Sequence, residues 1–287
     1  MRDYQDEIVG GDGKRKYKIV DNQGKILHSG VEIQKDYIPE QEGTTFGASD
    51  IATLQNYIAT GWVDTDNIWD TPIADRETGG YKLQMKSDIL SIHEGTKLKL
   101  TQDGVAKNFF VTKKSGLELS IFGGTDYTLE RSAISNVYFS NQHSPDGFPG
   151  NPDKWTISFK STAEKFITSP IINTWYNLSG LSIALPIGTW KLSYCGALYA
   201  DGTSATSLNC IATLSTNTTG ESDSELSALA LSNNTSAMAI NVYRDKIIGV
   251  STPVSYYCNV KTVVSGVSHI GIAGASAYII RAVCAYL

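Results

Sequence analysis

The second half of this sequence is almost free of charged residues, and that constrains its fold more than any motif does. Residues 151–287 hold 15 Asp, Glu, Lys and Arg, whereas residues 1–150 hold 38. The sequence closes on the apolar run Tyr278-Ile-Ile-Arg-Ala-Val-Cys-Ala-Tyr-Leu287. Because apolar surface is costly to leave in water, this run needs burial. We therefore predict two physically different halves.

The overall composition excludes several classes of protein. A chain of 287 residues with 41% hydrophobic residues is long enough for two or three folded domains. Its net charge of -5 offers no basic face for nucleic acid, since the basic cluster 14–18 lies among acidic residues. The first residues lack the apolar core of a secretion signal, which predicts folding in a cytoplasm.

Residues 262–280 carry no formal charge and approach the length of a membrane span. Serine and glycine interrupt this stretch repeatedly, so short strands are the better interpretation and no membrane insertion is predicted. The even number of cysteines would permit two disulfides. None forms a Cys-x-x-Cys pair and their neighbours are apolar, so we interpret them as free, buried thiols: Cys195, Cys210, Cys258 and Cys284.

Residues 1–79 are predicted to hold a hairpin, a short helix and a linker. Residues 17–20 and 25–28 flank Asp21-Asn-Gln-Gly24, which is typical of a β-hairpin with Gly24 in the left-handed conformation. A helix is expected from Ser49 or Asp50 to Thr60-Gly61, because apolar residues recur at helical spacing. Residues 62–80 are acidic and rich in turn formers, which favours a loop or linker.

Two β domains are expected beyond this region. Four segments alternate apolar with polar residues and predict a small antiparallel module over residues 80–150: 81–85, 97–101, 108–112 and 117–121. Short β segments at regular spacing predict a sandwich of jelly-roll type over residues 151–287: 154–160, 181–185, 189–195, 208–214, 237–243, 255–262, 269–272 and 277–285. A turn is expected at Pro186-Ile-Gly188, and residues 222–232 remain open between strand, loop and helical turn. The predicted fold class is mainly β.

Motifs for catalysis or cofactor binding are not recognisable. Gly-x-Ser-x-Gly is absent, and Gly10-Gly-Asp-Gly-Lys14 lacks the spacing of a phosphate loop. The four histidines show no zinc spacing. Asp64, Asp66 and Asp70 resemble the start of a calcium loop, but Ile68 and Trp69 occupy positions that need an oxygen ligand and glycine. We predict no catalytic residue, no cofactor and no metal.

Sugar recognition is the remaining chemistry that these residue types favour. Lectin-like sites stack sugar rings on aromatic side chains and bind hydroxyl groups with Asn, Asp and Ser. Aromatic residues within strands more often belong to the core. The candidate glycan contacts are Tyr199, beside Asp201 at an apparent loop, with Trp175 and Tyr176.

Residues 81–149 resemble a module found in structural proteins of tailed bacteriophages, especially those of Gram-positive bacteria. The shared phrases are Gly95-Thr-Lys-Leu-Lys-Leu-Thr-Gln102, Asn108-Phe-Phe-Val111, Gly123-Gly-Thr-Asp-Tyr-Thr-Leu129, Ala133-Ile-Ser135 and Gly147-Phe-Pro149. Residues 39–51 are similar to a Glu-Gly-Thr-Pro-Leu-Asn-Ala-type motif of phage fibre proteins, with Thr45 and Gly47 replacing the usual Pro and Asn. Residues 185–194 and 277–286 look like strands of a β-sandwich found at fibre tips.

The resemblance implies a virion protein of fibre, appendage or baseplate type, and it carries no catalytic residues over to this sequence. We expect a homotrimer whose N-terminal region binds other virion proteins and whose sandwich attaches to host glycan. The terminal run then becomes a core strand or a trimer-facing strand, with Arg281 on an outer face or paired at a subunit contact. Two alternatives are a purely structural head-fibre, collar or baseplate component, and a surface-glycan depolymerase, whose two carboxylates leave no sequence signature.

Overall fold

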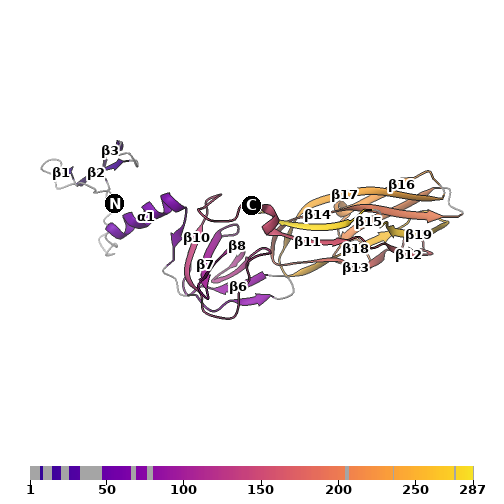
Figure 1. Cartoon of the computed structure of the whole chain (residues 1–287), viewed down its shortest axis with the longest axis horizontal. Helices are drawn as coiled ribbons and strands as arrows, with labels where there is room; N and C mark the ends of the chain where they lie inside the picture. Colours follow the sequence, from indigo (N-terminus) through magenta and orange to yellow (C-terminus); the bar gives the residue numbers. More distant parts are fainter. Residues whose placement is uncertain are drawn as a thin grey trace. The chain divides into compact units, whose positions relative to one another are not determined.

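The computed structural model describes residues 7–8, 15–20, 26–32, 47–65, 69–75, 80–203, 207–234, 236–274 and 276–286. The chain forms two compact units, residues 1–51 and 52–287. The predicted fold class is confirmed, because antiparallel sheets dominate and one short helix lies near the N-terminus (Figure 1).

The first unit contains a three-stranded sheet of β1 (Glu7–Ile8), β2 (Arg15–Val20) and β3 (Ile26–Glu32). Strands β2 and β3 pair antiparallel, which confirms the predicted hairpin strands. The predicted turn with Gly24 lies outside the described residues, as do the glycine-containing segment 10–14 and most of the fibre-like motif at 39–51.

The predicted helix is α1 (Ala48–Thr60), which spans the boundary between the two units. The amide of Gly47 donates to Asp50 Oδ2 at 2.7 Å, so Asp50 closes the first turn. Gly61 ends the helix with a φ of +77°, donating its amide to the carbonyl of Tyr57 at 2.7 Å. The predicted stop at Gly61 is confirmed, whereas the helix begins at Ala48, one residue before the predicted cap at Ser49 or Asp50.

The β module of the second unit is a seven-stranded antiparallel sheet in the order β4-β10-β7-β8-β9-β6-β5. Its strands are β4 (Val63–Asp64), β5 (Ile73–Asp75), β6 (Gly80–Gln84), β7 (Lys97–Gln102), β8 (Val105–Ser115), β9 (Glu118–Phe122) and β10 (Ser135–Ser140). The four predicted strands are confirmed as β6 to β9. Strand β10 was not predicted.

The prediction of a loop or linker for residues 62–80 is wrong at Trp62, β4, Trp69 and β5, while residues 66–68 and 76–79 lie outside the described residues. Trp62 is 1% exposed and its Nε1 donates to the carbonyl of Asp146 at 2.7 Å. Strands β4 and β5 pair with β10 and β6, and Trp69 bridges to Met85. Strands of two or three residues are too short to show an alternating pattern, so the acidic, turn-rich composition concealed them.

Strands β11 to β20 form the two sheets of a β-sandwich (Figure 1). The larger sheet contains β11 (Thr156–Ser161), β12 (Lys165–Thr168), β14 (Gly188–Gly202), β17 (Ala237–Val250), β19 (Val267–Ile272) and β20 (Tyr278–Cys284). The smaller sheet contains β13 (Tyr176–Leu185), β15 (Leu208–Ser215), β16 (Ser227–Ser232) and β18 (Val254–Lys261). Residues 222–232, left open from sequence, include the 3₁₀ turn Ser224–Leu226 followed by β16.

The order of the strands is that of a jelly roll. Strand β14 pairs along one side with β17 and along the other with β20 and then β19, which lie end to end. Strand β11 pairs with β20, and β12 pairs with β19. Strands β11 and β12 therefore act together as one interrupted strand, and so do β19 and β20. The smaller sheet has the order β13-β18-β15-β16. Counted with each interrupted strand as one, each sheet has four strands, and the chain connects them in the order of the two Greek keys of a jelly roll, as predicted.

The apolar C-terminal run is a core strand. Strand β20 lies between β11 and β14, and its residues Tyr278, Ile280, Ala282 and Cys284 are at most 1% exposed. Arg281 faces outward and its Nη2 lies 3.4 Å from Asp153 Oδ1, as expected for a charge on such a strand. The uncharged stretch 262–280 forms β19 and the start of β20. Among the described residues, no helix is long and apolar enough to cross a membrane.

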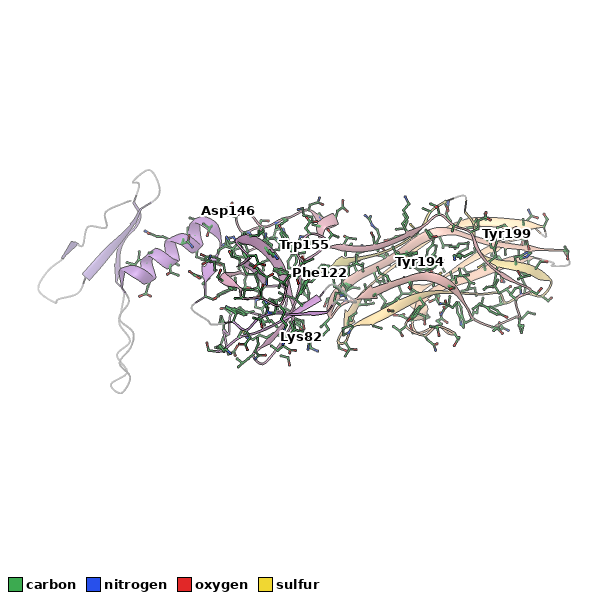
Figure 2. All side chains as sticks on the ribbon, turned by 60° about the horizontal axis from the view of Figure 1, so that its bottom comes forward. Lys82, Phe122, Asp146, Trp155, Tyr194 and Tyr199 are labelled. Atoms are coloured by element: carbon green, nitrogen blue, oxygen red, sulfur yellow. The ribbon has the colours of Figure 1, made fainter. Side chains whose placement is uncertain are left out.

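The β module and the jelly roll share a buried aromatic cluster. The rings of Phe110 and Trp155 meet edge to face at 4.7 Å, and Trp155 stacks on Phe148 at 5.1 Å. Figure 2 labels Phe122 and Trp155 in this region, and Tyr194 within the jelly roll. Gly188 has a φ of +145°, and a Cβ there would lie 2.9 Å from Thr112 Cβ. The turn at 186–188 therefore packs directly on strand β8.

Candidate binding site

The structure places the four predicted glycan contacts in two separate groups. Tyr199 and Asp201 both face outward from β14, on the outer surface of the larger sheet. Trp175 and Tyr176 lie at the start of β13, in the smaller sheet. The two groups therefore require separate consideration.

Tyr199 and Asp201 belong to a network whose polar groups are paired. The Tyr199 hydroxyl donates to Asp201 Oδ2 at 2.9 Å, and His269 Nδ1 lies 2.8 Å from Asp201 Oδ1. The hydrogen bond to the Asp201 carboxylate raises the pKa of Tyr199. The ring of Phe166 packs on Tyr199 with centroids 4.9 Å apart. Since each carboxylate oxygen already has a partner, this group offers ring surface rather than open hydrogen-bonding groups.

The second group lies at one end of the jelly roll, where four loops meet. We call the described residues of these loops, 169–175, 203, 207, 233–234, 236 and 262–266, the loop end. Hydrogen bonds join neighbouring loops and strands here, from Asn173 N to Thr262 O at 2.8 Å and from Ser169 N to Ser268 O at 2.7 Å. None of the four loop sequences contains Asp, Glu, Lys or Arg. The loop end is therefore an uncharged surface on a chain of net charge -5.

A buried asparagine holds the loop at 262–266. Asn209 on β15 is 3% exposed, and its Oδ1 accepts hydrogen bonds from Thr262 Oγ1 at 2.9 Å and from Val263 N at 3.1 Å. Thr262 is itself fully buried. Because both partners satisfy a buried polar atom, the loop is fixed in one conformation.

Tyr176 holds the loop at 169–175 in a similar way. Its hydroxyl accepts a hydrogen bond from Ile171 N at 2.9 Å, and its ring packs against the jelly-roll core. Tyr176 therefore positions the loop. Beside it, Lys261 Nζ lies 4.4 Å from the centroid of the Trp175 ring, within the range of a cation–π contact.

The loop end also presents apolar side chains that sequence reasoning did not single out. Ile171 is 67% exposed, Val263 43% and Ile172 40%. Phe166 and His269 were missed in the other group. No local signal identified them, because pairing between β12, β14 and β19 decides which side chains meet.

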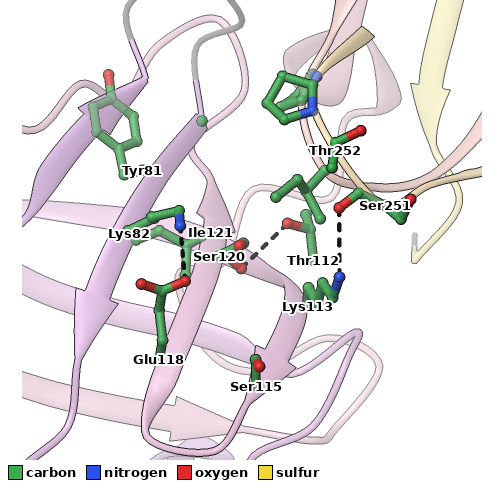
Figure 3. A pocket seen from close by; sticks show the side chains of 14 residues that line it. Tyr81, Lys82, Thr112, Lys113, Ser115, Glu118, Ser120, Ile121, Ser251 and Thr252 are labelled. Carbon is green, nitrogen blue, oxygen red and sulfur yellow. Dashed lines mark hydrogen bonds and ion pairs between the residues drawn. The ribbon is translucent and has the colours of Figure 1, made fainter.

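A cavity of about 320 Å³ lies between the β module and the jelly roll, away from both groups (Figure 3). Its polar side chains largely satisfy one another. Lys82 Nζ lies 2.8 Å from Glu118 Oε1, Thr112 Oγ1 donates to the carbonyl of Ser120 at 3.2 Å, and Lys113 Nζ donates to the carbonyl of Ser251 at 3.4 Å. We therefore interpret this cavity as a gap in the packing between the β module and the jelly roll.

Among the described residues, no group of three or more His, Cys, Asp or Glu side chains lies close enough together to hold a metal ion. In the segment 64–70, which resembles the start of a calcium loop, Asp70 Oδ1 lies 2.5 Å from Lys86 Nζ. Asp66 and Ile68 of this segment fall outside the described residues. All four cysteines are free, and three of them are buried. Burial raises the pKa of Cys258 and of Cys284 to about 12, which makes both thiols poor nucleophiles.

Comparisons with known proteins do not assign this chain to a family. No protein-family model and no curated protein matches it. Among solved structures it is similar to dimeric latent PorU from Porphyromonas gingivalis, with 11% identity, a TM-score of 0.24, and coverage of 78% of this chain and 24% of PorU. It is also similar to the VP2 subviral particle of infectious bursal disease virus, with 9% identity, a TM-score of 0.26, and coverage of 94% and 64%. The chain thus spans less than two thirds of either protein. Similarity at these TM-scores supports no conclusion about fold or function.

Proposed function

We propose that this chain is a virion structural protein of a tailed bacteriophage, of fibre or appendage type, which attaches to host surface glycan through the loop end of its jelly roll. One observation carries the proposal of attachment. The half-buried Trp175 ring and Lys261, the last residue of β18, lie beside loops whose backbones are held by Asn209 and Tyr176. A fixed aromatic ring beside polar loop groups is what a weak sugar site needs, because little conformational entropy is lost on binding.

The charge of the loop end supports a neutral or anionic glycan. Lys261 borders loops that contain no charged residue of their own, so an anionic polymer meets one cation and no acidic group in them. The virion assignment is supported by the sequence resemblance of residues 81–149. A homotrimer would present three such sites together, and linked weak sites raise avidity by about 10²–10⁴.

Binding to cell-wall polysaccharides isolated from a panel of Gram-positive bacteria tests the proposal. We expect retention of the wild-type protein on at least one polysaccharide, loss of retention in Trp175→Ala, and partial retention in Trp175→Phe, which keeps an aromatic ring. Leu90→Ala is the matched control, since this exposed residue lies in the β module. An equal affinity of Trp175→Ala and the wild type would contradict the assigned site.

The same panel separates the alternatives. A correctly folded oligomer that binds none of the polysaccharides and no host cell favours the purely structural head-fibre, collar or baseplate component. Reducing ends released during incubation favour the depolymerase. Either result would contradict the proposal that this protein attaches to host glycan and does not cleave it.

A further inference from the structure

A second cavity, of about 270 Å³, lies at the edge of the β module where β4 pairs with β10. Its lining combines an indole ring, an aliphatic side chain and three polar side chains: Trp69, Ile134, Asp64, Ser135 and Asn136. Pockets for drug-sized ligands occupy about 300–1,000 Å³. The cavity is therefore of a size for one small ring rather than for a longer ligand.

The polar side chains of this cavity are not used by the fold. Asp64, Ser135 and Asn136 are exposed, and none of their side chains bonds to another described residue. In the larger cavity between the β module and the jelly roll, by contrast, Lys82 pairs with Glu118. The smaller cavity thus offers a carboxylate, a hydroxyl and an amide that remain available to a ligand.

The apolar part of the cavity is fixed in place. Trp69 Nε1 donates to Thr65 Oγ1 at 3.1 Å, and Trp69 also forms a backbone bridge to Met85. Thr65 is itself tied to β10, because its amide donates to the carbonyl of Val137 at 3.1 Å. Trp69 and Ile134 both pack on the core of the β module while they line the cavity. A ligand therefore meets an indole whose position is set before binding.

A β-bulge turns two neighbouring side chains toward this cavity. The register between β10 and β7 shifts between Ser135 and Tyr138, and Asn136 has a φ of +47°. In a regular strand, successive side chains point to opposite faces. Ser135 and Asn136 are both exposed and both line the cavity. Bulges that re-aim side chains, and non-glycine residues in the left-handed conformation, are enriched at functional sites.

We propose that this cavity binds one neutral sugar residue, as a second glycan site in the β module. A sugar ring has an apolar face, which Trp69 and Ile134 contact, and a rim of hydroxyl groups. Asp64, Ser135 and Asn136 supply the hydrogen-bonding groups for that rim. The Asp64 carboxylate repels an anionic sugar, which makes a neutral one the preferred ligand. This site goes beyond attachment through the loop end and does not rest on it.

Fluorine NMR of the full-length chain labelled with fluorotryptophan tests the inference. The chain has five tryptophans, and Trp69→Phe identifies the Trp69 signal. Titration with glucose, galactose and N-acetylglucosamine should shift this signal saturably for at least one sugar. Asp64→Asn and Asn136→Gly should each weaken that binding about tenfold, the loss expected for one or two hydrogen bonds. Glycine adopts positive φ readily, so Asn136→Gly removes the amide and keeps the bulge.

Asp103→Gly is the matched control for the change at the bulge. Asp103 is exposed and has a φ of +53° in the turn between β7 and β8, outside the cavity. This variant should bind the sugar like the wild type. Unchanged signals of the buried Trp155 and Trp190 show that each variant is folded.

Three results would overturn the inference. The first is no saturable shift of the Trp69 signal with any of the three sugars. The second is wild-type affinity in either Asp64→Asn or Asn136→Gly. The third is a shift produced by choline and by none of the sugars, which would assign the cavity to an organic cation.

The two glycan sites fail separately. Trp175→Ala should abolish retention on polysaccharide and leave the response of Trp69 to the sugar intact. Asp64→Asn should weaken the response of Trp69 and leave retention through the loop end in place. Loss of either proposal therefore leaves the other standing.

Discussion

Phe122 of the β module and Trp190 of the jelly roll meet edge to face, with ring centroids 4.9 Å apart. Both side chains are at most 1% exposed. The indole Nε1 of Trp190 also donates to the carbonyl of Pro186, in the turn that packs on strand β8. Two sheets that bury aromatic rings against each other cannot lose one body without exposing the core of the other.

We therefore expect residues 80–286 to unfold in one cooperative transition. Phe122→Ala should lower the free energy of unfolding by about 3–5 kcal/mol, because it removes a large ring from a filled core. Leu90→Ala, at an exposed position, should change it by less than about 0.5 kcal/mol. Chemical denaturation followed by both tryptophan fluorescence and circular dichroism measures this, and two separate wild-type transitions would contradict a shared core.

Tyr194 links the two sheets of the jelly roll through its hydroxyl group. Its Oη donates toward the carbonyls of Ala212 and Leu226, at 3.1 and 3.0 Å, from a side chain that is 1% exposed. Burial raises its pKa well above the usual range, so it stays protonated at any working pH. Tyr194→Phe should cost about 1–3 kcal/mol by leaving buried carbonyls without this donor. Tyr243→Phe, at an exposed tyrosine, is the control. If Tyr194→Phe had the same midpoint of denaturation as the wild type, the link between the sheets would be refuted.

Asn209 should control the loop end without touching the ligand. Asn209→Ala removes the acceptor for the buried Thr262 Oγ1 and for the partly buried Val263 N. We expect faster hydrogen exchange at the Val263 amide and weaker polysaccharide binding at an unchanged oligomer mass. Leu90→Ala, at an exposed position in the β module, serves as the control. Unaltered exchange at Val263 in Asn209→Ala would show that other contacts hold the loop.

The acidic turn before β16 should make stability depend on pH. Lys246 Nζ lies 2.6 Å from Asp223 Oδ2, and this hydrogen bond lowers the pKa of Asp223. An unfolded aspartate titrates near about 3.9. A folded pKa below that value adds stability above about pH 3.9, and this contribution is lost as the pH falls through the folded pKa.

Lys246→Met should therefore reduce the difference in unfolding free energy between pH 7 and pH 3. Asp223→Asn should reduce it in the same direction but by less, because Lys246 also pairs with Glu225. The double variant should show little change beyond Lys246→Met, since both substitutions remove the Lys246–Asp223 interaction. Denaturation curves at a series of pH values measure the difference. Additive effects of the two substitutions would show that the residues act independently.

Several elements followed directly from local sequence. The helix boundaries depended on Asp50 and Gly61, which act within one turn of the backbone, and both were recognisable. Most strands of the jelly roll were found because alternation and turn residues recur along the chain. Strands β4, β5 and β12 were missed because two to four residues cannot show a period, and Trp62 gave no sign that its indole reaches Asp146.

The candidate site was only partly predictable, for a similar reason. Trp175 was named from residue type alone, but its partner Lys261 lies on β18, far away in sequence. Tyr199 and Asp201 were also named, yet their bonding to each other and to His269 depends on the pairing of β14 with β19. That pairing engages both carboxylate oxygens of Asp201, so the group offers ring surface instead of free polar groups.

The sequence by itself determined that the charge-poor half is a strand-rich β domain with a buried C-terminal strand. Local alternation and the cost of exposing apolar residues are enough to decide those points. Only the tertiary structure decided which strands are neighbours, and therefore which side chains gather on the outer surface of the larger sheet and at the loop end. Register between distant strands sets those surfaces, because shifting a strand by one residue would exchange its buried and exposed side chains.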